Sequence, residues 1–225
     1  MGQQIKRDIP VNQGFKTLLF FLLIYIFGSP FLSPYPSLAI VAHATLSITL
    51  FFSVYAVRKE KRQRTFAMTL LLPVLSLYWI GIYNIIPFSR TGSYLLLSIY
   101  LGLLVYFFIT ELKQATRVTL RLLVATLCLY LIIGLFWGAL YALLYEINPA
   151  AYGGVLLDNM QGNKYTVFVY FSMVTLTTLG YGDITPQTHG ATSLCQMEAI
   201  IGQFFTAVLV AWLVGNYISD KHSKE

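Results

Sequence analysis

Six long apolar runs constrain the fold of this chain more than any other feature of its sequence. They cover residues 15–28, 37–57, 65–88, 94–110, 118–147 and 192–218. A helix that crosses the hydrocarbon core of a bilayer needs about 20 predominantly apolar residues, and the runs reach or approach that length. The composition agrees, because 57% of the residues are hydrophobic and only 11% are charged. We therefore expect an all-α membrane protein with six transmembrane helices.

The distribution of positive charge predicts how these helices are oriented. If both termini are cytoplasmic, 13 of the 15 Lys and Arg residues fall on the cytoplasmic side, and only Arg90 and Lys164 lie outside. This bias follows the positive-inside rule. The sequence thus predicts a multi-pass protein of the cytoplasmic membrane. Its net charge of +6 then reflects topology, with attraction to anionic lipid as a secondary effect and no role in binding nucleic acid.

The first apolar run has two interpretations. It is short and follows Lys6 and Arg7, as the apolar core of a secretory signal does. No small-x-small cleavage site follows it, which favours a retained helix. The remaining helices would insert in the same way in either case.

The segment between the last two runs carries the most specific pattern. Residues 175–186 read Thr-Leu-Thr-Thr-Leu-Gly-Tyr-Gly-Asp-Ile-Thr-Pro. Gly180 and Gly182 can adopt a positive φ without steric cost, and a backbone whose φ alternates in sign turns successive carbonyls to the same side. A row of carbonyls can replace the water shell of a cation. Such a backbone can form a path for a dehydrated cation.

The run Thr-Thr-Leu-Gly-Tyr-Gly-Asp at 177–183 resembles the signature of the potassium-channel pore domain. Within that superfamily the chain is most similar to bacterial six-helix channels that lack a ligand-binding domain. The resemblance spans residues 118–219. It implies a re-entrant pore helix at 164–177, a selectivity-filter loop before the last helix, and a homotetramer, because one chain supplies one loop. It also implies passive conduction of K⁺, with Thr178, Leu179, Gly180, Tyr181 and Gly182 as the ion-binding residues, and no cofactor.

The chain departs from the family pattern at two places. Val174 stands where some relatives carry a pore-helix glutamate, and Tyr170 and Phe171 stand where a Trp pair often precedes the filter. These departures bear on filter geometry and slow inactivation.

The resemblance divides the chain into three parts. Residues 1–117 would form a four-helix N-terminal transmembrane region, residues 118–219 the pore domain, and residues 220–225 a short cytoplasmic tail. The fourth apolar run contains no Lys or Arg, whereas a voltage sensor needs several charges that move through the field. Arg117 and Arg121 fit a cytoplasmic linker and the start of the fifth helix. We therefore expect a channel that is not voltage-gated.

Three residues are expected to support the filter. By resemblance, the carboxylate of Asp183 accepts a hydrogen bond from a pore-helix side chain, and Tyr170 is the nearest candidate donor by position. A solvated carboxylate at the outer mouth is the alternative. Thr177 would support the filter from the end of the pore helix, although its hydroxyl could also bond back to a helix carbonyl.

The last helix carries further candidates. Glu198 is an ionisable residue in an apolar run and is therefore a functional candidate, although a structural hydrogen bond to a pore-helix threonine is an alternative. Gly202 lies on the same face and resembles the inner-helix hinge, with close helix packing as the alternative. The remaining candidates would line the inner cavity, and the two valines could form a gate that closes by dewetting: Gln203, Thr206, Val210 and Val214. His43 is expected to be a buried histidine with a partner.

Other classes of protein fit less well. Gly180-x-Gly182-Asp183 also matches intramembrane aspartyl proteases, but these enzymes need two carboxylates that share a proton. The one carboxylate that we expect within the membrane is Glu198 in the following helix, so an enzyme is not expected. A transporter with repeated halves is disfavoured because the two halves differ. A non-selective cation channel remains the alternative, and Tyr181 argues against it.

Overall fold

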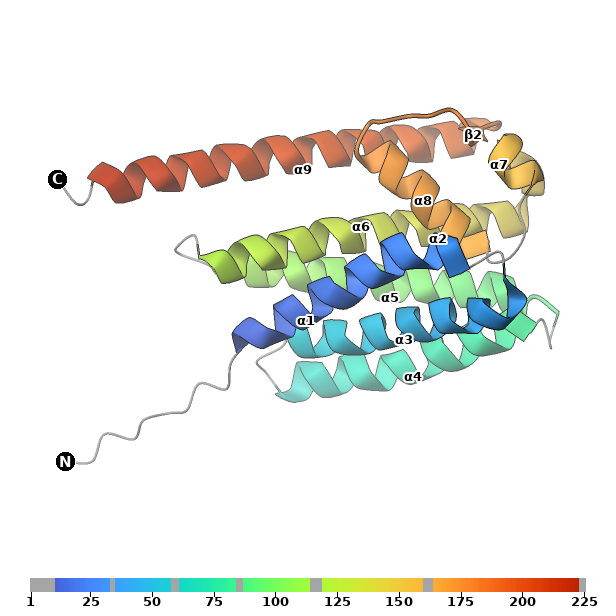
Figure 1. The fold of residues 1–225 in the computed structure, drawn as a ribbon, viewed down its shortest axis with the longest axis horizontal. Helices are drawn as coiled ribbons and strands as arrows, with labels where there is room; N and C mark the ends of the chain where they lie inside the picture. Colours follow the sequence, from blue (N-terminus) through green and yellow to red (C-terminus); the bar gives the residue numbers. More distant parts are fainter. Residues whose placement is uncertain are drawn as a thin grey trace.

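The computed structural model describes residues 11–32, 35–57, 61–83, 87–113, 119–159 and 164–222, and nearly all of them are helical (Figure 1). The N-terminal elements are α1 (Val11–Leu23), a π-helical turn η1 (Ile24–Gly28), α2 (Ser29–Leu32), α3 (Pro36–Val57), α4 (Lys61–Tyr83) and α5 (Ser89–Lys113). The C-terminal elements are α6 (Leu120–Ile147), a 3-10 turn η2 (Pro149–Ala151), β1 (Tyr152–Gly153), α7 (Val155–Asp158), α8 (Lys164–Leu176), β2 (Thr185–Pro186) and α9 (His189–His222).

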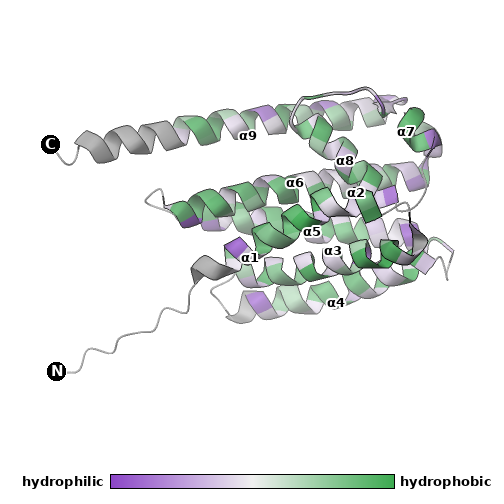
Figure 2. Ribbon diagram, in the orientation of Figure 1, coloured by the Kyte–Doolittle hydropathy of each residue, from purple (hydrophilic) through white to green (hydrophobic). Residues whose placement is uncertain are grey.

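Among the described residues, six helical segments are long and apolar enough to cross a membrane, which confirms the predicted number. They are Gly14–Leu32, Ser37–Ala56, Arg64–Tyr83, Ser89–Lys113, Leu120–Ile147 and His189–Trp212. The hydropathy colours of Figure 2 show the apolar residues along these helices.

Two of the predicted boundaries were wrong. The fourth helix is longer than the expected run at 94–110, because it includes Arg90 in its first turn and Lys113 in its last. Charged side chains at helix ends can reach the headgroup region, so a boundary drawn where charges begin is too short. The third predicted run extended to residue 88, but α4 ends at Tyr83.

The helices pack in layers with α6 at the centre. In Figure 1, α3 and α4 lie on one side of the bundle, α1 and α5 lie next to α6, and α8 is placed between α6 and α9. The sequence left open whether α1 is a removable signal. In the structure its Phe15, Leu18 and Leu22 are buried in the core, and the thiol of Cys128 in α6 donates to the carbonyl of Phe15 over 3.5 Å. α1 is thus an integral part of this bundle.

α6 and α9 differ sharply in burial. In the most apolar stretch of α6 72% of the residues are buried, whereas the corresponding share for α9 is 11%. Phe204, Val208 and Val210 of α9 are exposed. Within a single chain, α6 is therefore largely buried by other helices, whereas most of the described part of α9 is exposed.

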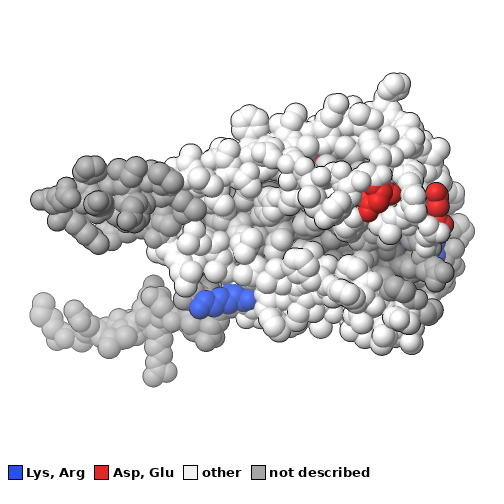
Figure 3. Space-filling model, turned by 45° about the horizontal axis from the view of Figure 1, so that its top comes forward, with Lys and Arg blue, Asp and Glu red and all other residues white. Residues whose placement is uncertain are grey.

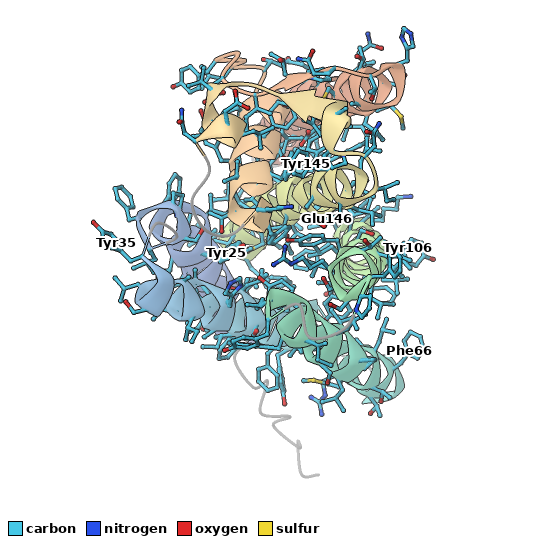
Figure 4. All side chains as sticks on the ribbon, turned by 90° about the vertical axis from the view of Figure 1, so that its right-hand side faces the viewer. Tyr25, Tyr35, Phe66, Tyr106, Tyr145 and Glu146 are labelled. Carbon is cyan, nitrogen blue, oxygen red and sulfur yellow. The ribbon has the colours of Figure 1, made fainter. Side chains whose placement is uncertain are left out.

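Charges lie at the two ends of the bundle. The face in Figure 3 is nearly free of charge along its length, with a blue patch toward the end where both termini lie and red patches at the opposite end. Figure 4 views that opposite end and shows Tyr35, Phe66 and Tyr106 pointing away from the bundle. A surface with few charges between the two ends of the bundle, together with aromatic side chains that point outward, is typical of a protein surrounded by lipid.

Candidate ion-conduction site

The site is organised around the short helix α8. Its sequence has no Gly or Pro, and its buried residues include Tyr165, Phe168 and Ser172. Two helices approach it closely through glycines. A Cβ at Gly138 of α6 would lie 2.9 Å from the Cα of Val169, and small residues are what allow helix backbones to come this near.

Gly202 makes the matching approach from the other side. A Cβ at this position of α9 would overlap the carbonyl oxygen of Leu176, the last residue of α8. The end of α8 is therefore in contact with the backbone of the inner helix. The geometry is that of close packing, which was one of the two alternatives considered for Gly202.

The backbone after α8 folds back onto the end of this helix. The N–H groups of Thr177 and Thr178 donate to Met173 (3.1 Å) and Thr175 (2.9 Å), and those of Leu179 and Gly180 donate to the carbonyl of Val174 at 2.9 and 3.4 Å. These four backbone N–H groups therefore all have hydrogen-bond acceptors within the chain. The expected end of this helix at residue 177 lies one residue beyond the observed end.

Three alternate residues in this segment have positive φ. The values are 58° for Thr178, 60° for Gly180 and 78° for Gly182. Within the part of the chain that the structure describes, no donor reaches the main-chain carbonyls of residues 178–182. All five of these residues are exposed. The segment thus presents unpaired carbonyl oxygens on a backbone of alternating φ.

Thr178 is the strained member, because positive φ is costly for a residue with a Cβ. Its hydroxyl donates to the carbonyl of Thr177 over 2.7 Å and accepts from Nε2 of Gln203 over 2.8 Å. These bonds hold the residue in its conformation, and they join the start of the carbonyl segment to α9.

Leu179 and Tyr181 are exposed by 56% and 66%. Neither side chain is packed within the single chain.

The segment after residues 178–182 is held by contacts with β1 and α8. β2 pairs antiparallel with β1, with Tyr152 opposite Pro186. The hydroxyl of Tyr170 donates to the carboxylate of Asp183 over 2.5 Å, the contact expected from position. Burial, together with this bond to Asp183, raises the pKa of Tyr170 to about 12. Tyr170 therefore stays a donor across the neutral pH range.

Glu198 is fully buried where α6, α8 and α9 meet. Its carboxyl group accepts from the hydroxyl of Tyr141 and lies 2.5 Å from the hydroxyl of Ser172. Glu198 thus has a hydroxyl partner in α8, as the structural alternative predicted, but that partner is Ser172 and not a threonine. The hydroxyls of Thr175 and Thr177 instead bond back to the carbonyls of Phe171 and Met173.

The remaining predicted residues lie on the bare face of α9. Gln203, Thr206 and Val210 are exposed, and the hydroxyl of Thr206 bonds to its own helix at Gly202 over 3.2 Å. The side chain of Val214 lies outside the described residues. In the N-terminal bundle, His43 is buried and its Nδ1 lies 2.7 Å from the hydroxyl of Tyr78.

Four residues of this site were not predicted from the sequence. Gly134 and Gly138 are spaced four apart in an apolar run, and that spacing is a recognised signal of close helix approach. Ser172 and Tyr141 carry no such signal, because only the folded structure brings them to Glu198.

No group of three or more His, Cys, Asp or Glu residues that could hold a metal ion occurs among the described residues. The backbone carbonyls of the 178–182 segment are candidate ligands for a cation because no donor reaches them in the described part of the chain.

Comparisons with known proteins agree with this region of the chain. Residues 125–218 match the family model described as an ion channel. TWiK family of potassium channels protein 7 of Caenorhabditis elegans is 29% identical over 72 residues, which are 32% of this chain and 13% of that protein. Two pore potassium channel a of Oryza sativa subsp. japonica is 30% identical over 111 residues, which are 49% of this chain and 28% of that protein. The aligned parts thus span less than a third of these relatives. The matches indicate that this part of the chain is similar to ion channels.

Proposed function

We propose that the protein is a potassium-selective channel that conducts K⁺ passively, with residues 178–182 as its selectivity filter. The observation that carries this proposal is the row of unpaired carbonyls on a backbone whose φ alternates in sign. Carbonyls in such a row can replace the hydration shell of K⁺. Support for potassium comes from the names of the two relatives, both potassium channels.

The filter requires four chains. One chain contributes one row of carbonyls, and this row surrounds nothing by itself. The bare face of α9 and the exposed side chains of Leu179 and Tyr181 offer apolar surface that copies of the chain would cover. α8 would then be a re-entrant pore helix, and its C-terminal end, which carries partial negative charge, would favour a cation below the filter.

Orientation follows from the positive-inside rule. The end that carries Lys16, Arg64, Lys113 and Arg121 would be cytoplasmic, together with both termini. The loop that contains the filter would face outward in the cytoplasmic membrane.

The test is ion flux into liposomes that contain the purified protein. We expect flux along a potassium gradient, little flux of sodium, and block by barium, which has a similar radius and twice the charge. Equal permeability to both monovalent ions would instead favour the non-selective alternative.

A matched pair of variants tests the position of the filter. A Cβ at Gly180 or at Gly190 meets no atom within 4 Å, but only Gly180 has positive φ. Gly180→Ala should therefore abolish flux because of backbone strain alone, and Gly190→Ala should conduct as the parent does. Normal flux through Gly180→Ala would place the filter elsewhere.

Cross-linking tests the assembly. Protein in detergent should cross-link to four copies and no further. A monomer with full flux would refute the filter proposal.

Voltage should have little influence on opening. α3 contains no charged residue, and the Arg and Lys residues of α5 lie in its end turns. Arg117 lies outside the described residues, and Arg121 is paired with Glu111 at 3.6 Å. Moving one charge through the field is worth about 2.3 kcal/mol per 100 mV, so steep gating needs several charges. Currents that switch over a few tens of millivolts, and flatten when Arg121 is neutralised, would contradict this proposal.

A further inference from the structure

The buried carboxyl group of Glu198 has hydroxyl partners and no cation beside it. From α6 the ionisable side chains that face it are Tyr130 and Tyr141, from β1 it is Tyr152, and on its own helix it is Cys195. α8 contributes Ser172. No salt bridge to Glu198 exists within the described residues. An ionised carboxylate here would be a buried charge without a counterion, which is strongly unfavourable.

The number of hydrogens around Ser172 favours the neutral state of this group. The Ser172 hydroxyl lies 2.8 Å from the carbonyl oxygen of Gly134 and 2.5 Å from Oε1 of Glu198. A hydroxyl has one hydrogen to donate, and the Gly134 carbonyl can only accept. If Ser172 donates to Gly134, the hydrogen between Ser172 and Glu198 must belong to Glu198.

Oε2, the other carboxyl oxygen of Glu198, is the first acceptor in a continuous chain of hydrogen bonds. Tyr141 donates to Oε2 of Glu198, Glu198 donates to Ser172, and Ser172 donates to Gly134. Every hydrogen then has an acceptor and every hydroxyl is used. An ionised Glu198 would take the hydrogen of Ser172 and leave the Gly134 carbonyl without it.

We propose that Glu198 is a positioning residue that is carried as a neutral carboxylic acid, and that its proton ties the inner helix α9 to α8 and α6 directly behind the filter. This inference rests on the proposed function for its effect on flux, but not for its effect on protonation. Gly202 lies one helical turn further on and packs on Leu176, and Gln203 then reaches Thr178. The proton of Glu198 thereby fixes where α9 meets the inner end of the filter.

Three variants of Glu198 separate the possible roles. Glu198→Gln keeps the length, places an amide donor toward Ser172 and leaves a carbonyl acceptor for Tyr141, so its potassium flux should equal that of the parent. Glu198→Asp is one methylene shorter and cannot span both partners. Glu198→Ala leaves both hydroxyls without their partner. The potassium flux of Glu198→Asp and of Glu198→Ala should be lower than that of the parent by about tenfold or more, because buried polar groups are left unpaired.

Infrared spectroscopy of the purified protein reads the proton directly. At neutral pH we expect the C=O band of a protonated carboxylic acid in the parent protein and its loss in Glu198→Gln. Glu111→Gln is the control, because Glu111 is part-exposed and paired with Arg121, and it should leave the band unchanged. Ser172→Ala should shift the band, since the acid proton loses its acceptor.

The outcomes are distinct. Absence of the band in the parent, or a folded Glu198→Gln that does not conduct while the parent does, would overturn the inference, because both mean that the ionised form is present or needed. A parent that carries no potassium flux but shows the band would refute the proposed function and leave the neutral acid in place.

Discussion

Gly202→Ala is the sharpest test of how the inner helix meets the filter region. The added methyl group would overlap the carbonyl oxygen of Leu176, and it would also lie 3.1 Å from the Cδ1 atom of that residue. A backbone oxygen at the end of α8 cannot move aside as a flexible side chain can. The substitution should therefore push α9 away from α8.

The magnitude follows from a comparison with Gly190→Ala in the same helix. Alanine is favoured over glycine in a helix interior by about 1 kcal/mol, and this gain is smaller for Gly190→Ala because Gly190 is the second residue of α9. A Cβ at Gly190 meets nothing within 4 Å, so only Gly202→Ala pays for overpacking, which typically costs about 1–3 kcal/mol. The free energy of unfolding of Gly202→Ala should therefore be lower than that of Gly190→Ala by up to about 3 kcal/mol.

Denaturant titration in detergent measures the free energy of unfolding of both variants, and liposome flux measures their conduction. We expect Gly202→Ala to unfold at lower denaturant concentration and to conduct poorly, because Gln203 would no longer reach Thr178. If Gly202→Ala proves as stable as Gly190→Ala, then α9 does not pack on α8 as described. Normal stability with altered opening would instead favour the hinge alternative.

Three further substitutions test other contacts by the same unfolding measurement. Gly138→Ala should destabilise by about 1–3 kcal/mol, because its Cβ would lie 2.9 Å from the Cα of Val169; an unchanged midpoint would contradict the packing of α8 on α6. Tyr170→Phe removes the donor to Asp183 and should cost about 1.5–3 kcal/mol and weaken potassium selectivity, whereas full selectivity would assign Asp183 to solvent. Thr119→Ala should cost about 1 kcal/mol, because Oγ1 of Thr119 accepts from the N–H of Leu122 over 3.3 Å at the start of α6, and Thr119→Ser should retain that stability.

The sequence predicted well whatever depends on local chemistry. Apolar length gave the number of spanning helices, and the glycines at 180 and 182 are two of the three positions with positive φ in the filter segment. Thr178 is the third, and no local rule predicts it, because a threonine there is strained unless Gln203 holds it. Glu198 could be singled out as costly, but its partners come from helices 26 and 57 residues away along the chain.

The contrast between α6 and α9 bears on how the filter forms. α6 is covered by its own chain, in a core that includes residues of α8, whereas α9 and the filter segment are largely exposed. The filter segment holds a strained threonine and carbonyls without donors, and neither is favourable for a chain alone. Conformational strain of this kind persists only where the surroundings determine it fully. In the assembly that we propose, neighbouring chains would supply the packing for Tyr181 and the permeant ions would bind the carbonyls. A filter in its conducting form would then be a property of the assembled channel, built onto a bundle that each chain folds by itself.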